Sequence, residues 1–68
     1  MKAFEVLITS PSDREKIVAE IWFANNLIAE INQDGDDLEI DIYPSQKLTF
    51  KLDDLLEILK IAKKKLIE

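Results

Sequence analysis

Apolar residues recur at every second position along most of the first half of the chain, a period of two residues that is typical of β-strands. This period is found within residues 4–8, 17–23, 27–33 and 38–42. A strand that alternates in this way buries one face and leaves the other exposed. The pattern therefore predicts four short strands, provided that turns lie between them.

Two of the expected turns can be tested through the faces they bring together. Asparagine tolerates left-handed backbone, so Ala24-Asn25-Asn26 predicts a three-residue loop, and Asp34-Gly35 is a strong signal for a two-residue hairpin turn. With these loops one face is apolar on all the paired strands: Phe23 pairs with Leu27, Ile21 with Ala29, Ala19 with Ile31, and then Ile31 with Leu38, Ala29 with Ile40 and Leu27 with Ile42. Both turns agree on the buried face, and a slip of one residue in either turn would destroy that agreement.

The stretch from Ser10 to Glu15 allows two interpretations. Ser12 and Glu15 have the spacing of a helix capping box, which would make residues 17–31 a helix ended by Gly35 and give a β-α-β-α order. Alternatively, Ser10-Pro11 ends the first strand and residues 10–15 form a hairpin loop. Pairing Thr9 with Lys16 then places Ile8, Val6 and Phe4 opposite Ile17, Ala19 and Ile21. The agreement between the two later turns favours the hairpin.

The last part of the chain has a helical period. Apolar residues recur on one helical face, and acidic residues begin the segment while lysines end it, which suits the helix dipole. The expected stripe consists of Leu52, Leu55, Leu59, Ala62 and Leu66. Ile58 and Ile61 lie off this stripe, either at its buried rim or in a dimer contact, and Leu48 and Phe50 form a brief edge strand or pack under the helix. The sequence thus predicts one α+β domain over residues 1–68, a four-stranded antiparallel meander with a C-terminal helix on one face, and β-α-β-α is the alternative.

The charge of the chain narrows the class of partner. Residues 1–45 contain three Lys/Arg and ten Asp/Glu, a balance of −7, and residues 46–68 contain six and four, a balance of +2, which together give the net charge of −5. An acidic surface repels phosphate backbones, so we expect no nucleic-acid partner and favour a basic protein. No signal peptide or membrane-length apolar run is visible, so the expected location is the cytoplasm, without a membrane partner.

The predicted register also places acidic residues together on the face away from the helix. Glu5 falls opposite Glu20, Glu20 opposite Glu30, and Glu30 opposite Glu39, so that four glutamates form one row. Like charges directly opposite in a sheet are destabilising, which favours a surface that binds Lys and Arg of a partner. Trp22 and Ile28 lie beside the row and supply an apolar anchor. A solvated face that keeps the sheet soluble is the competing interpretation.

Little in the composition points to catalysis. The chain has no histidine, the commonest general base, and no cysteine, the strongest nucleophile. These two residues are also the usual zinc ligands. One glycine does not make a phosphate-binding loop. A Ca²⁺ site formed by Asp34, Asp36, Asp37 and Glu39 is conceivable, but the spacing is not that of an EF-hand and the turn explains Asp34-Gly35. We therefore expect no enzyme, no cofactor and no metal site.

Three segments carry a resemblance to known sequences. "LITSPSDREKIVAEIW", "AEINQ" and "LEIDIYP" resemble a group of short bacterial proteins to which no activity is attached. The resemblance covers strand and turn residues, so it favours the hairpin and implies no functional residue. The sequence predicts a non-enzymatic binding protein, an inhibitor, immunity or regulatory partner of a basic protein. A self-associating structural protein, a possible homodimer, is the alternative.

Overall fold

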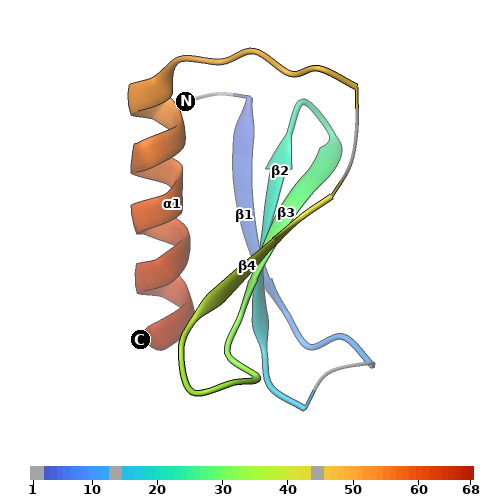
Figure 1. Ribbon diagram of the computed structural model, residues 1–68, viewed down its shortest axis with the longest axis vertical. Coiled ribbons are helices and arrows are strands. Elements are labelled where there is room, and N and C mark those ends of the chain that lie inside the picture. The colour runs from blue at the N-terminus through green and yellow to red at the C-terminus, as the bar shows by residue number, and fades with distance from the viewer. Residues whose placement is uncertain (1–2, 13–14, 44–45) are drawn as a thin grey trace.

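The protein is an antiparallel sheet of four strands with one helix, an α+β fold (Figure 1). The computed structural model describes residues 3–12, 15–43 and 46–68. Its elements are β1 (Phe4–Thr9), β2 (Val18–Phe23), β3 (Asn26–Asn32), β4 (Glu39–Ile42) and α1 (Leu52–Ile67). The strands follow the chain in the order β1-β2-β3-β4, so the predicted meander is confirmed and the β-α-β-α alternative is wrong.

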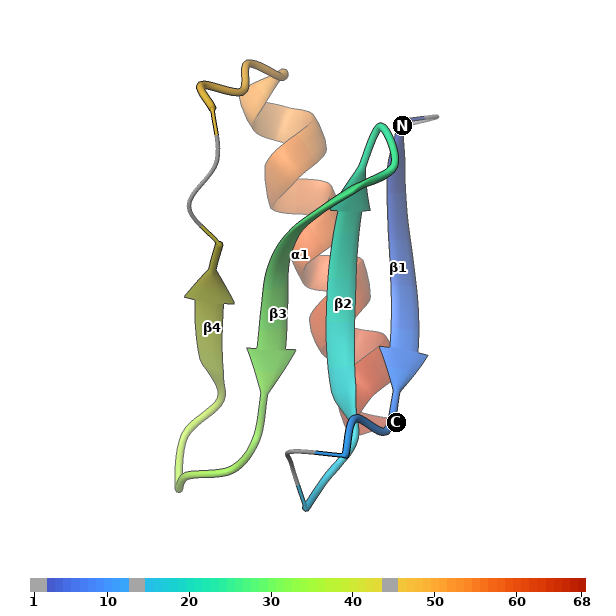
Figure 2. The same ribbon diagram turned by 90° about the vertical axis from the view of Figure 1, so that its right-hand side faces the viewer.

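The helix covers only part of one sheet face. It packs chiefly against β1 and β2, and Figure 2 shows β4 without a helix behind it. The core lies between α1 and the sheet and consists of Phe4, Ala19, Ile21, Ile28, Ala29, Ile31, Ile58, Ala62 and Leu66.

The buried face of α1 is rotated from the predicted stripe. Ile58, Ala62 and Leu66 are the buried helix residues, whereas Leu52 is exposed. Ile58 therefore belongs to the core and to neither of the two places expected for it. The rotation follows from the position of the helix over β1 and β2, because the residues that face these strands are buried and those that face β4 are not.

The pairing of β1 with β2 is shifted by two residues from the prediction. Phe4 pairs with Phe23 and Thr9 with Val18, so the loop runs from Ser10 to Ile17, and Thr9 does not pair with Lys16. Within that loop, residues 13–14 lie outside the described part of the chain. A shift of two keeps each side chain on its predicted face.

The turn between β2 and β3 is shorter than predicted and is followed by a bulge. Ala24 and Asn25 form a two-residue turn with φ of 49° and 68°, the positive values that a type I′ hairpin requires at both central positions. Ile21 pairs with Ala29, but Trp22 pairs with Leu27, so Ile28 has no partner on β2. Such an extra residue is a β-bulge, which places two successive residues opposite one.

The connection from β3 to β4 is longer than the predicted two-residue turn. Asn32 pairs with Glu39, so residues 33–38 form the loop, and Gly35 does not have the positive φ that a type I′ turn needs. The Asn32 side chain accepts a hydrogen bond from the Asp34 backbone N–H over 3.4 Å, an Asx-turn that redirects the chain before Asp34-Gly35. The predicted two-residue turn at Asp34-Gly35 is therefore wrong, whereas the predicted antiparallel pairing of the strands on either side of it is confirmed.

Three phenylalanines close one end of the core. The ring centroids of Phe4, Phe23 and Phe50 lie 4.8 to 5.1 Å apart in tilted or edge-on pairs, the favoured geometries for aromatic contacts. Phe50 and Leu48 come from the irregular segment before α1 and pack against the core, and neither lies in a strand. This segment therefore fixes the start of the helix over the sheet.

The left-handed backbone at Ala24 predicts that this residue can be improved. A non-glycine residue in this region costs roughly 1–2 kcal/mol, and asparagine tolerates it better than alanine. Ala24 is exposed, so its side chain makes no buried contact that a substitution would lose. We expect Ala24→Asn to raise the free energy of unfolding by about 0.5–1 kcal/mol in urea titrations. Ala24→Val is the control and should lower it, and equal stability of the two variants would contradict the turn geometry.

Candidate functional site

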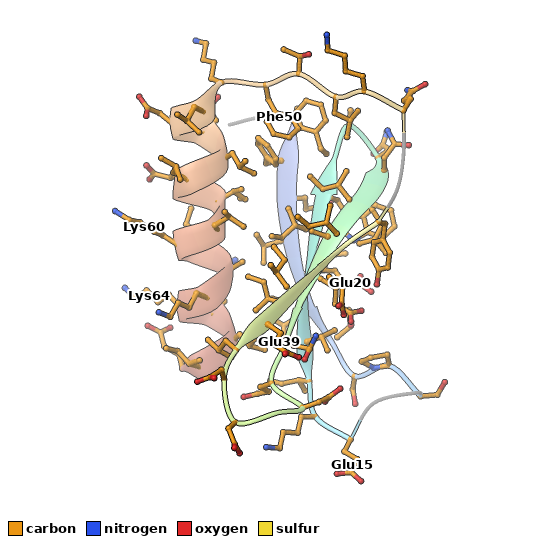
Figure 3. The ribbon with its side chains drawn as sticks, in the orientation of Figure 1. Glu15, Glu20, Glu39, Phe50, Lys60 and Lys64 are labelled. Atoms are coloured by element: carbon orange, nitrogen blue, oxygen red, sulfur yellow. The ribbon has the colours of Figure 1, made fainter. Side chains whose placement is uncertain are left out.

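The sheet face away from α1 gathers the acidic side chains of the strands. Residues directly opposite on neighbouring strands share a face, which places the carboxylates around Trp22. We call this the acidic face, defined by Glu5, Glu20, Glu30, Glu39, Asp41 and Trp22. Figure 3 shows Glu20 on the side of the sheet opposite the helix.

The predicted continuous row of four glutamates is wrong. Glu20 and Glu30 are directly opposite, as predicted, but the row is completed by Leu7 on β1 and Asp41 on β4. Glu5 lies opposite Trp22, and Glu39 lies opposite Asn32. The outer strands are each displaced by two residues, so the glutamates stay on the predicted face in different rows.

Trp22 is held against the acidic side chains. Its indole Nε1 donates a hydrogen bond to Glu20 Oε1 over 3.2 Å, and the ring is partly buried. A hollow of about 410 Å³ adjoins the ring, and it is lined by Ala3, Phe4, Glu5, Trp22, Ala24 and Asn25. The tryptophan end of the face is therefore accessible and is bordered by a carboxylate.

Glu30, one of the predicted partner-binding residues, is buried in the sheet. Its side chain is buried, and Glu30 Oε2 accepts a hydrogen bond from the Tyr43 hydroxyl over 3.3 Å. Tyr43 follows β4, and its backbone N–H donates to the Ile28 carbonyl over 3.0 Å. Glu30 is therefore an internal part of the sheet, and the sequence pattern gave no sign of its tyrosine partner.

Asn32 organises the opposite end of the face. It is buried, and its Nδ2 donates to Asp41 Oδ2 over 3.1 Å while its Oδ1 accepts from the Asp34 N–H. The amide uses its donor and acceptor to link β3, β4 and the loop between them. Val18 and Asn32 are both buried here, so this end of the face is closed.

Ile28 does not lie on the acidic face. The bulge turns it to the helix side, where it is buried in the core. Leu27, which pairs with Trp22, takes the predicted place beside the indole and is partly buried. A bulge leaves the alternation of the surrounding residues intact, so the pattern of the sequence did not reveal it.

The four strands themselves bring no positively charged side chain to this face. None of the four strands contains Lys or Arg, and the lysines of α1 lie in the other layer. Figure 3 shows Lys60 and Lys64 pointing away from the sheet. Within the described strands, the charged side chains are therefore all carboxylates.

The described residues offer no arrangement for metal chemistry. Among them, no three His, Cys, Asp or Glu side chains are grouped so as to hold a metal ion. In the same part of the chain, no helix has the length and apolar character needed to cross a bilayer.

No protein-family model, curated protein or solved structure matches the chain.

The amide of Asn32 is expected to be essential for the junction of β3 and β4. Asn32→Asp removes the donor to Asp41 and places two carboxylates together, so we expect a loss of about 1–3 kcal/mol at pH 7 in urea titrations. The loss should shrink as the pH falls to about 4, because protonation restores a donor and removes the repulsion. Asn26→Asp is the exposed control and should change stability much less. Equal losses in the two variants would show that the buried amide is dispensable.

Proposed function

We propose that the protein is a non-enzymatic binding module, an inhibitor, immunity or regulatory protein that docks a basic protein on the acidic face. The observation that carries the proposal is the set of five carboxylates on one sheet face, with no Lys or Arg in any strand, around the partly buried Trp22.

The accessible carboxylates set the kind of partner. Glu5 and Glu39 are exposed and Glu20 is partly buried, so these three can meet Lys or Arg side chains without rearrangement of the sheet. Complementary charge raises the rate of association and selects against acidic competitors. The buried Glu30 is left out of the contact, which narrows the predicted binding residues to Glu5, Glu20, Trp22 and Glu39, with Leu27 beside the indole.

Trp22 supplies the apolar part of the contact. Aromatic residues near the centre of an interface often dominate its free energy, because they bury a large area with few rotatable bonds. The hydrogen bond to Glu20 orients the ring before binding, and the hollow beside it gives a partner side chain a place to insert. The apolar contact through Trp22 and the charge contacts through Glu5 and Glu20 therefore lie next to each other at one end of the acidic face.

Fluorescence provides a direct test, because Trp22 is the only tryptophan in the chain. Proteins captured from the source cells at about 50 mM salt are purified and titrated against the free protein. We expect the Trp22 emission to change on binding, and the affinity and association rate to fall as salt rises to about 500 mM, since screening shortens the range of the charges.

Matched variants distinguish an effect of the acidic face on binding from an effect of the net negative charge of the chain. Glu5→Gln/Glu20→Gln should weaken the complex about tenfold or more, whereas Asp53→Asn/Glu57→Gln removes the same charge from α1 and should have little effect. Trp22→Ala, followed by calorimetry, should weaken it at least as strongly as the glutamate pair. The proposal fails if both charge pairs have equal effects or if no partner binds in a salt-dependent way.

A further inference from the structure

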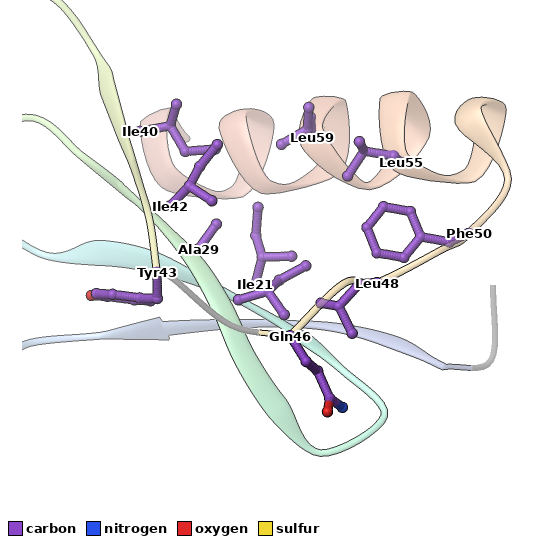
Figure 4. Close-up of a pocket in the computed structure, with 11 residues that line it drawn as sticks. Ile21, Ala29, Ile40, Ile42, Tyr43, Gln46, Leu48, Phe50, Leu55 and Leu59 are labelled. Carbon is purple, nitrogen blue, oxygen red and sulfur yellow. The ribbon is translucent and has the colours of Figure 1, made fainter.

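The helix-side face of the sheet is apolar beyond the area that α1 covers. Ile40 and Ile42 of β4 point to this side but are 43% and 73% exposed. Between them and α1 lies a cavity of about 410 Å³, and most of its lining is apolar: Ile21, Ile28, Ala29, Ile40, Ile42, Tyr43, Gln46, Leu48, Phe50, Leu55 and Leu59. In Figure 4 the Tyr43 and Gln46 side chains point away from the helix, so the part that faces α1 is wholly apolar.

The cavity continues along the helix into a second hollow. This hollow has a volume of about 270 Å³ and shares Ile40 and Leu59 with the first. Glu39 and Lys63 border it from opposite sides. We call the two together the β4 groove, an apolar channel with one acidic and one basic rim.

The rim of α1 carries an apolar seam of its own. Leu52, Leu56, Leu59 and Lys63 follow one another at intervals of four, three and four residues, the heptad spacing by which two helices pack side by side. Leu52 is 68% and Leu56 is 49% exposed. Leu59 and Lys63 line the β4 groove, and Leu52 and Leu56 continue the same helical face toward the start of α1.

We propose that a second copy of this chain occupies the β4 groove, with α1 of each copy covering the β3–β4 half of the other copy's sheet. The groove needs an occupant with an apolar helical stripe, and the exposed seam of α1 is such a stripe. A two-fold axis parallel to the strands satisfies both copies at once, because the same patch then serves as groove and as insert. The seam of each helix lies along the β4 groove of the other copy, and the two seams meet at the two-fold axis.

The charges agree with this arrangement. The loop before β4 and the start of β4 carry exposed acidic residues, and the second half of α1 carries exposed lysines beside the seam: Asp36, Asp37 and Glu39 on one side, and Lys60 and Lys63 on the other. The incoming helix of the second copy brings its lysines over the acidic rim. Lys63, as the one polar residue of the seam, fixes the register of the two helices.

The β4 groove lies on the helix side of the sheet and shares only Glu39 with the acidic face, so a second copy there goes beyond the proposed function. It also answers a need of the chain, since a domain of this size buries only about 60% of its unfolded surface. The alternatives are a groove that binds an apolar ligand, a groove that binds a helix of another protein, and a groove that stays empty. The experiments below distinguish a second copy from these three.

Site-specific crosslinking tests the seam, because the chain contains no cysteine. Leu56→Cys places one thiol beside its counterpart across the two-fold axis, and we expect it to form a disulfide-linked dimer under mild oxidation at about 10 µM protein. Lys64→Cys, whose parent side chain points away from the sheet in Figure 3, is the matched control and should stay monomeric. Equal crosslinking of the two variants, or none in Leu56→Cys, would overturn the proposal.

Sedimentation equilibrium between about 1 µM and 1 mM gives an independent measure. The wild type should shift from monomer to dimer over this range, and Leu56→Glu should raise the dimer dissociation constant at least about tenfold, because each copy then buries a charge in the seam. The variant should remain folded, since Leu56 is half exposed. A wild type that is monomeric throughout, or a dimer that Leu56→Glu leaves intact, would refute a second copy in the groove. Binding of the partner on the acidic face should be unchanged in Leu56→Glu, so that failure of this proposal leaves the other standing.

Discussion

One helix is too narrow for this sheet, and much of the structure depends on that mismatch. An α-helix with its side chains is about 10 Å across, whereas the outer backbones of four strands spaced about 4.8 Å apart are separated by about 14 Å. With α1 chiefly over β1 and β2, the inner residues Ile40 and Ile42 of β4 are only partly covered by the second layer. The segment with Leu48 and Phe50 fills part of the difference at one end, and the rest stays as a groove. The exposed leucines of α1 lie at the edge of the same gap, so one geometric constraint produces both unpaired surfaces.

The opposite face is subject to a different constraint, because many carboxylates lie close together on one sheet and like charges repel. Three of them accept hydrogen bonds from neutral donors, Glu20 from Trp22, Glu30 from Tyr43 and Asp41 from Asn32. The donors in these three hydrogen bonds are neutral, so the bonds orient the carboxylate oxygens without adding positive charge.

The sequence predicted which face each strand residue occupies better than it predicted which residue lies opposite. Alternation has a period of two, so it excludes a slip of one residue and does not detect a slip of two. In both outer strands the observed pairing differs from the predicted pairing by two residues. Glu5 and Glu39 are therefore outside the row of Glu20 and Glu30, but both remain on the expected face. The middle pair, Glu20 and Glu30, was placed correctly because the shorter Ala24-Asn25 turn and the bulge at Ile28 offset each other. The hydrogen bonds of Asn32 and Tyr43 join residues far apart in the chain, and no local pattern indicated them.

The bulge at Ile28 bears on how this chain tolerates changes in length. Without that residue, Leu27 opposite Trp22 and Ala29 opposite Ile21 would follow each other in a regular ladder, and all other strand residues would keep their faces. A related sequence one residue shorter at this point could therefore build the same sheet. It would lose the isoleucine that forms part of the floor beneath β4 and α1. Ile28 therefore contributes to the apolar cavity between β4 and α1 and is not needed for strand pairing. Related chains should lose or keep this residue according to whether they keep that cavity, and the stability of the strands should matter less.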